Sequence, residues 1–124
     1  MSEDWSATTR AITAGRQGQG ASLNAPLWPT TAWQSEGVDA TRRLATKQRP
    51  DEFYGRYGNP TVRAFERAIA ELEGTDDALA LASGIVALAT TVLALCSPGD
   101  HIVGKRAMFG GTVAFLAGPC ARFG

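Results

Sequence analysis

The clearest periodic pattern in the chain is helical and covers residues 60–73. Apolar side chains recur there at intervals of three and four residues, which places them on one face of a helix. Asn59 and Pro60 suit a helix start, because asparagine caps free N–H groups and proline lacks a donor that would be unpaired there. Gly74 suits the end. The apolar positions are Val62, Phe65, Ile69 and Leu72, and the charged positions on other faces are Arg63, Glu66, Arg67 and Glu73.

The second half of the chain has two short runs on either side of a long apolar one. Residues 78–82 are apolar, a Ser-Gly pair interrupts them, and residues 85–96 are apolar on almost every side. A Pro-Gly-Asp turn then leads into HIVG at residues 101–104. This order predicts a βαβ unit with parallel strands and a right-handed crossover, and therefore an α/β fold. Because residues 85–96 need cover on several sides, we expect a larger body around them than this chain provides.

From Met1 to about Pro50 the chain shows little sustained periodicity. The stretch AGRQGQGASLNAPLWPTTAW holds three glycines, two prolines and two tryptophans. This composition predicts an extended arm that lies on a surface and attaches through its aromatic side chains. A disordered tail is the alternative, against which the indole rings of Trp28 and Trp33 argue. We therefore expect an arm over residues 1–55 and a domain over residues 56–124.

Composition excludes several classes of function. Twelve basic and twelve acidic residues cancel, so no global field recruits nucleic acid or an anionic membrane. No run approaches the roughly 18 apolar residues of a membrane helix, and the polar start MSEDWSATTR is not a secretory signal. Cys96 and Cys120 lack a CxxC partner, which predicts buried free thiols, and His101 is the only histidine. We expect a cytoplasmic protein with no metal centre, no membrane contact and no nucleic-acid partner.

Three short segments carry candidate chemistry. YGRYGNPT, residues 54–61, places two tyrosines and an arginine before the predicted helix, in a loop too aromatic for a solvated turn and too polar for a core strand. Ser83 and Gly84 lie where a helix follows a strand, and such a helix start can bind phosphate, although most Ser-Gly pairs only cap the helix. Neither GxxxxGK[ST] nor GxGxxG occurs. In MFGGT, Phe109 either lies against a flat ligand or fills a core.

Taken in order, YGRYGNPT, ALASGIVAL and GDHIV…MFGGT resemble the Cys/Met-metabolism family of pyridoxal-phosphate enzymes. This family includes cystathionine γ-synthase, cystathionine lyases, methionine γ-lyase and the O-acyl-homoserine sulfhydrylases. TRAITAGRQ and APLWPTTAW resemble its opening segments, and the spacings of 31 residues from Tyr54 to Ile85 and 24 from Ile85 to Phe109 need no gap. The resemblance implies the start of a fold type I (aspartate-aminotransferase-like) large domain, an arm that contacts a partner subunit, and a homo-oligomer built as a dimer of dimers.

The resemblance also implies roles at pyridoxal 5'-phosphate. Tyr54 and Arg56 would reach the cofactor phosphate of the neighbouring subunit, and a guanidinium fork suits such a dianion. Backbone donors at Ser83, Gly84 and Ile85 would hold the phosphate in the same subunit. Phe109 would stack on the pyridine ring. Ile85 replaces the usual methionine, which keeps the backbone donor, and Phe109 replaces the usual tyrosine, which removes a hydroxyl.

For the reaction, the resemblance implies an amino-acid substrate. The expected activity is replacement of the γ-substituent of O-succinyl- or O-acetyl-homoserine by a sulfur nucleophile, with a γ-lyase as the alternative. No catalytic residue is expected in this chain, because neither Lys47 nor Lys105 has the Ser-x-Thr-Lys-like surroundings of the family's cofactor-binding lysine. Two interpretations follow: an amino-terminal portion of such an enzyme, or a non-catalytic remnant that pairs with a full-length relative.

Overall fold

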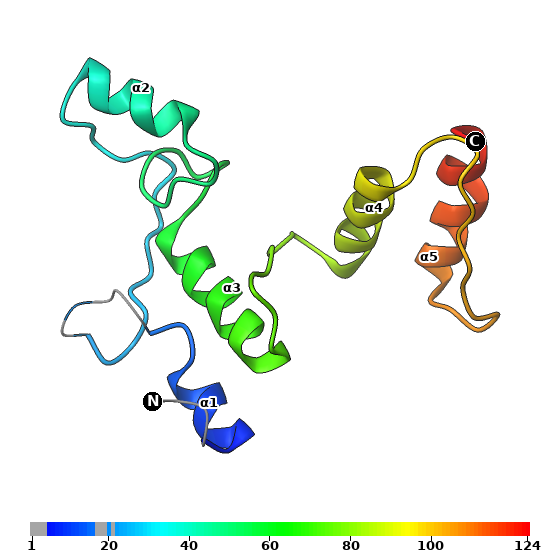
Figure 1. The fold of residues 1–124 in the computed structure, drawn as a ribbon, viewed down its shortest axis with the longest axis horizontal. Coiled ribbons are helices and arrows are strands. Elements are labelled where there is room, and N and C mark those ends of the chain that lie inside the picture. Colours follow the sequence, from blue (N-terminus) through cyan, green and yellow to red (C-terminus); the bar gives the residue numbers. More distant parts are fainter. Residues whose placement is uncertain (1–4, 17–19, 21) are drawn as a thin grey trace. The chain divides into compact units, whose positions relative to one another are not determined.

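The computed structural model describes residues 5–16, 20 and 22–124 (Figure 1). The chain divides into two compact units, Met1–Ala80 and Leu81–Gly124. Among the described residues, the first unit has three helices, and the second has two helices and a π-helical turn. They are α1 (Ala7–Thr13), α2 (Val38–Thr46), α3 (Pro60–Glu73), α4 (Gly84–Leu95), α5 (Gly110–Phe115) and the π-helix Leu116–Cys120.

Helix α3 has the predicted bounds, and its caps have the predicted chemistry. The Asn59 side chain accepts a hydrogen bond from the N–H of Thr61 at 2.8 Å and donates to the carbonyl of Trp28 at 2.9 Å. Gly74 ends the helix in the left-handed conformation, with φ 69°. The prediction for residues 60–73 is therefore confirmed, and the same cap holds a segment of the arm against the start of the helix.

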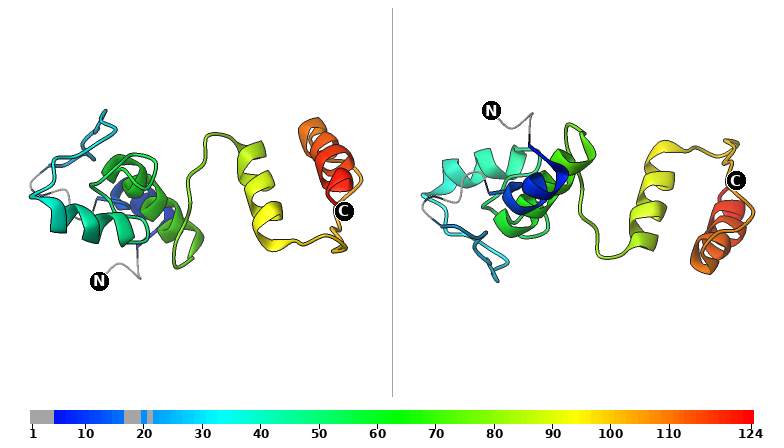
Figure 2. Two further views of the ribbon diagram at one scale, coloured as in Figure 1. Left: turned by 90° about the horizontal axis from the view of Figure 1, so that it is seen from above. Right: turned by 90° about the horizontal axis from the view of Figure 1, so that it is seen from below.

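In the described part of residues 1–55, the structure has two short helices that the sequence pattern does not predict. Ser6 caps α1 by accepting from the N–H of Thr9, whereas α2 begins at Gly37 without a side-chain cap. Helix α1 lies beside α3 (Figure 2). Gly15 permits this approach, because it has φ 73° and a Cβ there would overlap the carbonyl oxygen of Ala64. The division between an arm and a larger domain stays a prediction.

The extended part of the arm runs along residues 54–58, here named the Tyr-Arg loop. Ala32 and Tyr54 form an isolated antiparallel bridge, and the N–H of Gly55 donates to the carbonyl of Thr31 at 2.7 Å. The Trp28 N–H donates to the hydroxyl of Thr61 at 2.9 Å. These contacts fix the arm to the segment that carries the candidate site residues.

The structure assigns no strand within residues 5–16, 20 and 22–124, including the two predicted strand segments, 78–82 and 101–104. A strand is stable when its backbone groups pair with a neighbouring strand, and neither segment has such a partner in the described chain. The helix between them is confirmed as α4, with Ser83 as its N-cap. The α/β arrangement therefore stays a prediction, although the central helix is present.

Helix α4 contains no buried residue. Large apolar side chains of its unit are exposed, among them Leu93 at 63%, Leu95 at 78% and Val103 at 97%. Exposed apolar surface of this kind favours association. We expect the 124-residue chain, expressed alone, to aggregate and to show no turnover. Size-exclusion chromatography with light scattering measures this, and a soluble, active monomer would contradict it.

Three smaller observations complete the fold. Cys96 and Cys120 are free and half-buried, so the predicted full burial is wrong. In the described part of the chain, no three His, Cys, Asp or Glu side chains form a group that could hold a metal ion. No described helix has both the length and the apolar character that a membrane span requires.

Candidate functional site

The Tyr-Arg loop is a tight turn that presents Arg56 between two aromatic rings. The carbonyl of Tyr54 accepts hydrogen bonds from the N–H groups of Tyr57 at 2.8 Å and Gly58 at 3.3 Å. The Arg56 guanidinium carbon lies 5.3 Å from the ring centroid of Tyr54 and 5.1 Å from that of Tyr57. Both distances allow a cation–π attraction. Since no carboxylate within the described residues forms an ion pair with Arg56, its charge is available to an anion.

The turn rests on Pro50, whose side chain is fully buried. A Cβ at Gly58 would overlap the carbonyl oxygen of Pro50, so only glycine permits this approach. A cavity of about 460 Å³ adjoins the same loop and is lined by Trp33, Phe53, Tyr54, Arg56 and Tyr57, with four smaller side chains. The residues for ring contacts and for charge are therefore gathered in one loop.

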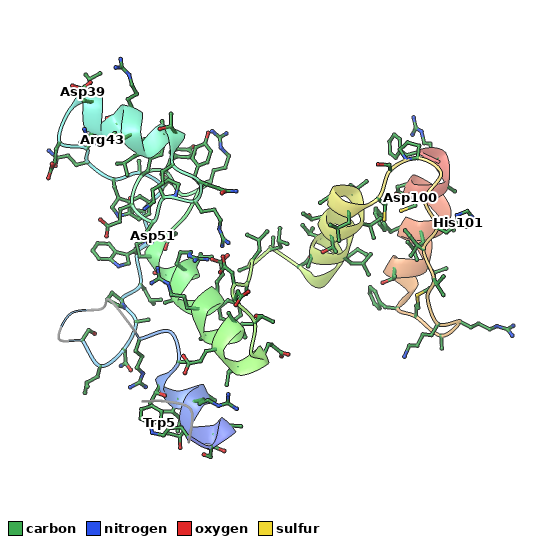
Figure 3. The ribbon with its side chains drawn as sticks, viewed as in Figure 1. Trp5, Asp39, Arg43, Asp51, Asp100 and His101 are labelled. Carbon is green, nitrogen blue, oxygen red and sulfur yellow. The ribbon has the colours of Figure 1, made fainter. Side chains whose placement is uncertain are left out.

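Beside this loop lies a network of six charged side chains. At its centre, the Glu66 side chain is 3% exposed and accepts from Arg49 at 2.6 Å and Arg63 at 2.8 Å. Its other oxygen accepts from the N–H of Ala80 at 2.8 Å. The position of Glu66 on a polar face of α3 does not predict this burial. The network consists of Arg49, Asp51, Arg63, Glu66, Arg67 and Asp77, and Figure 3 shows Asp51 beside the start of α3.

The network favours the charged forms of two of its members, Arg63 and Asp77. The hydrogen bond from Arg63 to Glu66 is the main cause that raises the pKa of the Arg63 guanidinium, against the opposing effect of burial. The N–H of Ala78, followed by Arg63, lowers the pKa of the Asp77 carboxyl from its ordinary value of 3.8. A lowered carboxyl pKa stabilises the fold above the ordinary value, and this contribution is lost as the pH falls through the lowered one.

In the second unit, α4 begins with an open backbone. The Ser83 hydroxyl accepts from the N–H of Val86 at 3.3 Å, as an N-cap does. A Cβ at Gly84 would meet nothing within 4 Å, so the space beside this backbone is free. The first N–H groups of a helix have no acceptor within the helix, and none is present elsewhere in the described chain for Gly84 or Ile85. This helix start therefore offers donors to an anion.

Phe109 precedes α5 and is 76% exposed. The simpler interpretation of MFGGT, a phenylalanine that fills a core, is therefore wrong for this unit. A Cβ at Gly111 would lie 2.7 Å from the edge of the Phe109 ring, so glycine lets the ring lie over the start of the helix. The ring is free to contact a flat ligand.

The structure thus places Tyr54 and Arg56 together in the first unit and the other four predicted residues in the second. A phosphate ester of an aromatic aldehyde would bind to a cation, to N–H donors and to an aromatic ring. The first unit contains a free guanidinium, and the second contains open N–H groups and an exposed ring. Sequence reasoning gave no individual role to Tyr57, Gly58 or Pro50, which shape the loop. Tyr57 and Gly58 belong to the motif YGRYGNPT, whereas nothing local identifies Pro50.

Comparisons with known proteins agree with this chemistry. The family model for Cys/Met metabolism PLP-dependent enzymes matches residues 8–124. An O-succinylhomoserine sulfhydrylase of Pseudomonas aeruginosa is 46% identical over 87 residues, which are 70% of this chain and 21% of that protein. An L-methionine gamma-lyase of Pseudomonas putida is 35% identical over 118 residues, which are 94% of this chain and 30% of that protein.

A solved structure has a similar fold. The crystal structure of metB from Corynebacterium glutamicum matches with a TM-score of 0.82 at 28% identity, and the match covers 98% of this chain and 30% of that one. The chain therefore spans less than a third of each of these proteins, 21% of the first relative and 30% of the second.

Proposed function

Because the chain belongs to the Cys/Met-metabolism family of PLP-dependent enzymes, we propose that it binds pyridoxal phosphate as part of a sulfur-amino-acid enzyme. The observation that carries this proposal is the start of α4. There, Ser83 caps the helix, and the N–H groups of Gly84 and Ile85 have no acceptor in the described chain. A phosphate is the anion that such a helix start binds best.

Each candidate residue has a binding or orienting role in this proposal. Gly84 and Ile85 donate to the cofactor phosphate, and the exposed ring of Phe109 lies against the cofactor ring. Arg56 of a second copy, oriented by Tyr54 and Tyr57, supplies the counter-charge. When bound, pyridoxal phosphate withdraws electrons from the bonds around the α-carbon of an amino acid. The site would then be complete only in a homo-oligomer.

The reaction that we propose is replacement of the γ-substituent of O-succinyl- or O-acetyl-homoserine by a sulfur nucleophile. With sulfide and the succinyl ester, the new C–S bond gives homocysteine and the broken C–O bond releases succinate. The name of the relative from Pseudomonas aeruginosa, O-succinylhomoserine sulfhydrylase, supports this reaction. Phe109 supports it too, since its ring has no hydroxyl to move a proton.

A carbon–sulfur lyase is the second candidate, favoured by the relative from Pseudomonas putida that covers 94% of the chain. The two are separated by assaying the protein that contains this chain with O-succinylhomoserine and sulfide, and separately with methionine. Homocysteine and succinate identify the sulfhydrylase, and methanethiol identifies the lyase. Neither product from a protein loaded with pyridoxal phosphate would reject both reactions.

We further propose that the residues beyond this chain supply the lysine that binds the cofactor covalently. This is consistent with the 21% to 30% of the relatives' length that the chain covers. The nucleotide sequence after codon 124 tests it directly: a continuation, in frame or after a frameshift, with a lysine in a Ser/Thr-rich setting supports the proposal. An unrelated continuation supports a non-catalytic remnant that pairs with a full-length relative.

A charge reversal that keeps the cap tests the phosphate site. Aspartate caps helices as well as serine does, so Ser83→Asp is expected to leave α4 stable. Its carboxylate would repel a phosphate at the same N–H groups, and we expect the affinity for pyridoxal phosphate to fall about tenfold or more. Fluorescence titration with the cofactor measures the affinity.

The matched control is Ser83→Asn, because asparagine has nearly the same shape as aspartate and also caps helices, but carries no charge. We expect this variant to keep the affinity within about threefold of the natural protein, since asparagine caps about as well as serine. Equal affinities for the two variants would show that no anion binds at the start of α4.

A further inference from the structure

We propose that Glu66 is a positioning residue for Arg56. It acts through Arg49, which pairs with Glu66, and through the adjacent Pro50, whose carbonyl contacts Gly58 in the turn of residues 54–58. The inference rests on the proposed function, because it gives Arg56 the role of a phosphate ligand. It assigns a purpose to a buried carboxylate that the site itself does not use.

The carboxylate of Glu66 is buried and fully bound. A carboxylate that is 3% exposed needs strong partners, because burying a charge without them is costly. Arg49 donates at 2.6 Å, Arg63 at 2.8 Å and the N–H of Ala80 at 2.8 Å, so both oxygens are bound. Short, charge-assisted bonds of this kind fix direction as well as distance. Glu66 therefore holds Arg49 in one place.

Both sequence neighbours of Pro50 form ion pairs with side chains of α3. On one side, Arg49 pairs with Glu66. On the other side, Asp51 pairs with Arg67 at 3.5 Å and lies 3.8 Å from Arg63. Pro50 between them is fully buried, with its carbonyl against Gly58. A shift of Pro50 would therefore move the turn that carries Arg56.

The backbone of Arg49 has a left-handed conformation. Its φ of 55° makes it the non-glycine residue with positive φ in the described chain. This conformation is unfavourable for an arginine and persists where surrounding contacts impose it. The contacts here are the guanidinium bonds to Glu66 and to Asp77, the latter at 2.9 Å. The network thus holds the chain in a path that the backbone alone would leave.

The charged network and the Tyr-Arg loop line a common cavity. A small space of about 120 Å³ is lined both by network residues, namely Arg49, Arg63 and Glu66, and by loop residues, namely Arg56, Tyr57 and Gly58. Within the network three arginines balance three carboxylates, whereas Arg56 has no carboxylate partner in the described chain. The network therefore supports the loop without neutralising Arg56.

A double-mutant cycle separates this role from a general structural one. The affinity for pyridoxal phosphate is measured for the natural protein, Glu66→Gln, Arg56→Ala and the double variant. Glutamine keeps the shape of the side chain but loses the charge that binds Arg49. We expect Glu66→Gln to weaken binding about tenfold when Arg56 is present, and by less than about twofold when Arg56 is already alanine. An equal factor in both backgrounds would overturn the proposal.

A second measurement does not depend on the cofactor. Trypsin hydrolyses the Arg56–Tyr57 peptide bond at a rate that follows the opening of the loop. In the cofactor-free protein we expect Glu66→Gln to speed this cleavage about tenfold relative to cleavage after Arg43 in α2. The control is Glu73→Gln, the same change at an exposed position of α3. An unchanged ratio, or equal acceleration at both sites, would overturn the proposal.

The two measurements also tell apart the failure of the two ideas. If Arg56→Ala leaves the cofactor affinity unchanged, the proposed phosphate role of Arg56 is wrong, and the trypsin ratio alone then decides whether Glu66 orders the loop. If Arg56→Ala weakens binding but Glu66→Gln does not, the proposed function stands and the positioning role is wrong.

Discussion

Replacing Arg56 by alanine is expected to lower the affinity for pyridoxal phosphate about 100-fold, which corresponds to about 2.7 kcal/mol. The guanidinium is exposed, lies between the rings of Tyr54 and Tyr57, and has no carboxylate partner in the described chain. Its removal should therefore cost a phosphate contact and little stability. Titration of the cofactor-free protein, followed by absorbance, gives the affinity, and thermal unfolding gives the stability.

Two variants sharpen this test. Arg56→Lys keeps the charge but loses the fork, so an intermediate affinity is expected. Arg43→Ala removes an exposed arginine of α2 that has no ion pair in the described chain, and it should change the affinity by less than about twofold. If Arg43→Ala lost as much affinity as Arg56→Ala, only the general positive charge of the protein would matter.

The contribution across subunits has its own readout. Arg56→Ala is mixed, under conditions of subunit exchange, with a variant that lacks the proposed downstream lysine. Each protein alone should be inactive, while hybrid dimers contain one site with both groups intact. Partial recovery of activity is expected, and no recovery in verified hybrids would contradict the role of Arg56 in a neighbour's site.

Replacing Glu66 by alanine is expected to lower the free energy of unfolding by about 3 kcal/mol. The change leaves Arg49 and Arg63 facing each other with one carboxylate, Asp77, in common, and it removes the acceptor of the Ala80 N–H. Uncompensated charge near a buried position is costly, although the side chains of Arg49 and Arg63 are 32% and 17% exposed and can in part be hydrated.

Urea unfolding, followed by tryptophan fluorescence, measures this change, since Trp28 and Trp33 belong to the same unit as Glu66. Glu73→Ala is the matched control on α3 and should change stability by no more than about 0.5 kcal/mol. Glu66→Gln should fall between them, because the amide still accepts one hydrogen bond. A loss below about 1 kcal/mol in Glu66→Ala would show that the network is solvated and contributes little.

The parts of the fold that the sequence predicts are those with local signals. Asn59, Pro60 and Gly74 identify both ends of α3, and Ser83 identifies the start of α4. Helix α1 has seven residues and α2 has nine, too short for a clear period, and Gly37 gives α2 no capping side chain. Strand formation at residues 78–82 depends on a neighbouring strand, which no local pattern reveals.

The same distinction applies to the candidate site. Arg56 and Ser83 are identifiable because each belongs to a short string whose chemistry is local. Glu66 is not, since its partner Arg49 lies 17 residues away and its surroundings on α3 are those of a surface helix. Only the path of the chain, which brings residues 49 and 66 together, reveals that this charged position is buried.

Position 49 is subject to two opposing evolutionary constraints. Its backbone, at φ 55°, is best tolerated by glycine or asparagine, whereas its side chain has to reach Glu66 and Asp77 at once. Any single replacement that relaxes the backbone abandons both carboxylates. Divergent copies of this protein that keep Glu66 and Asp77 are therefore expected to keep an arginine at position 49 despite its unfavourable backbone conformation.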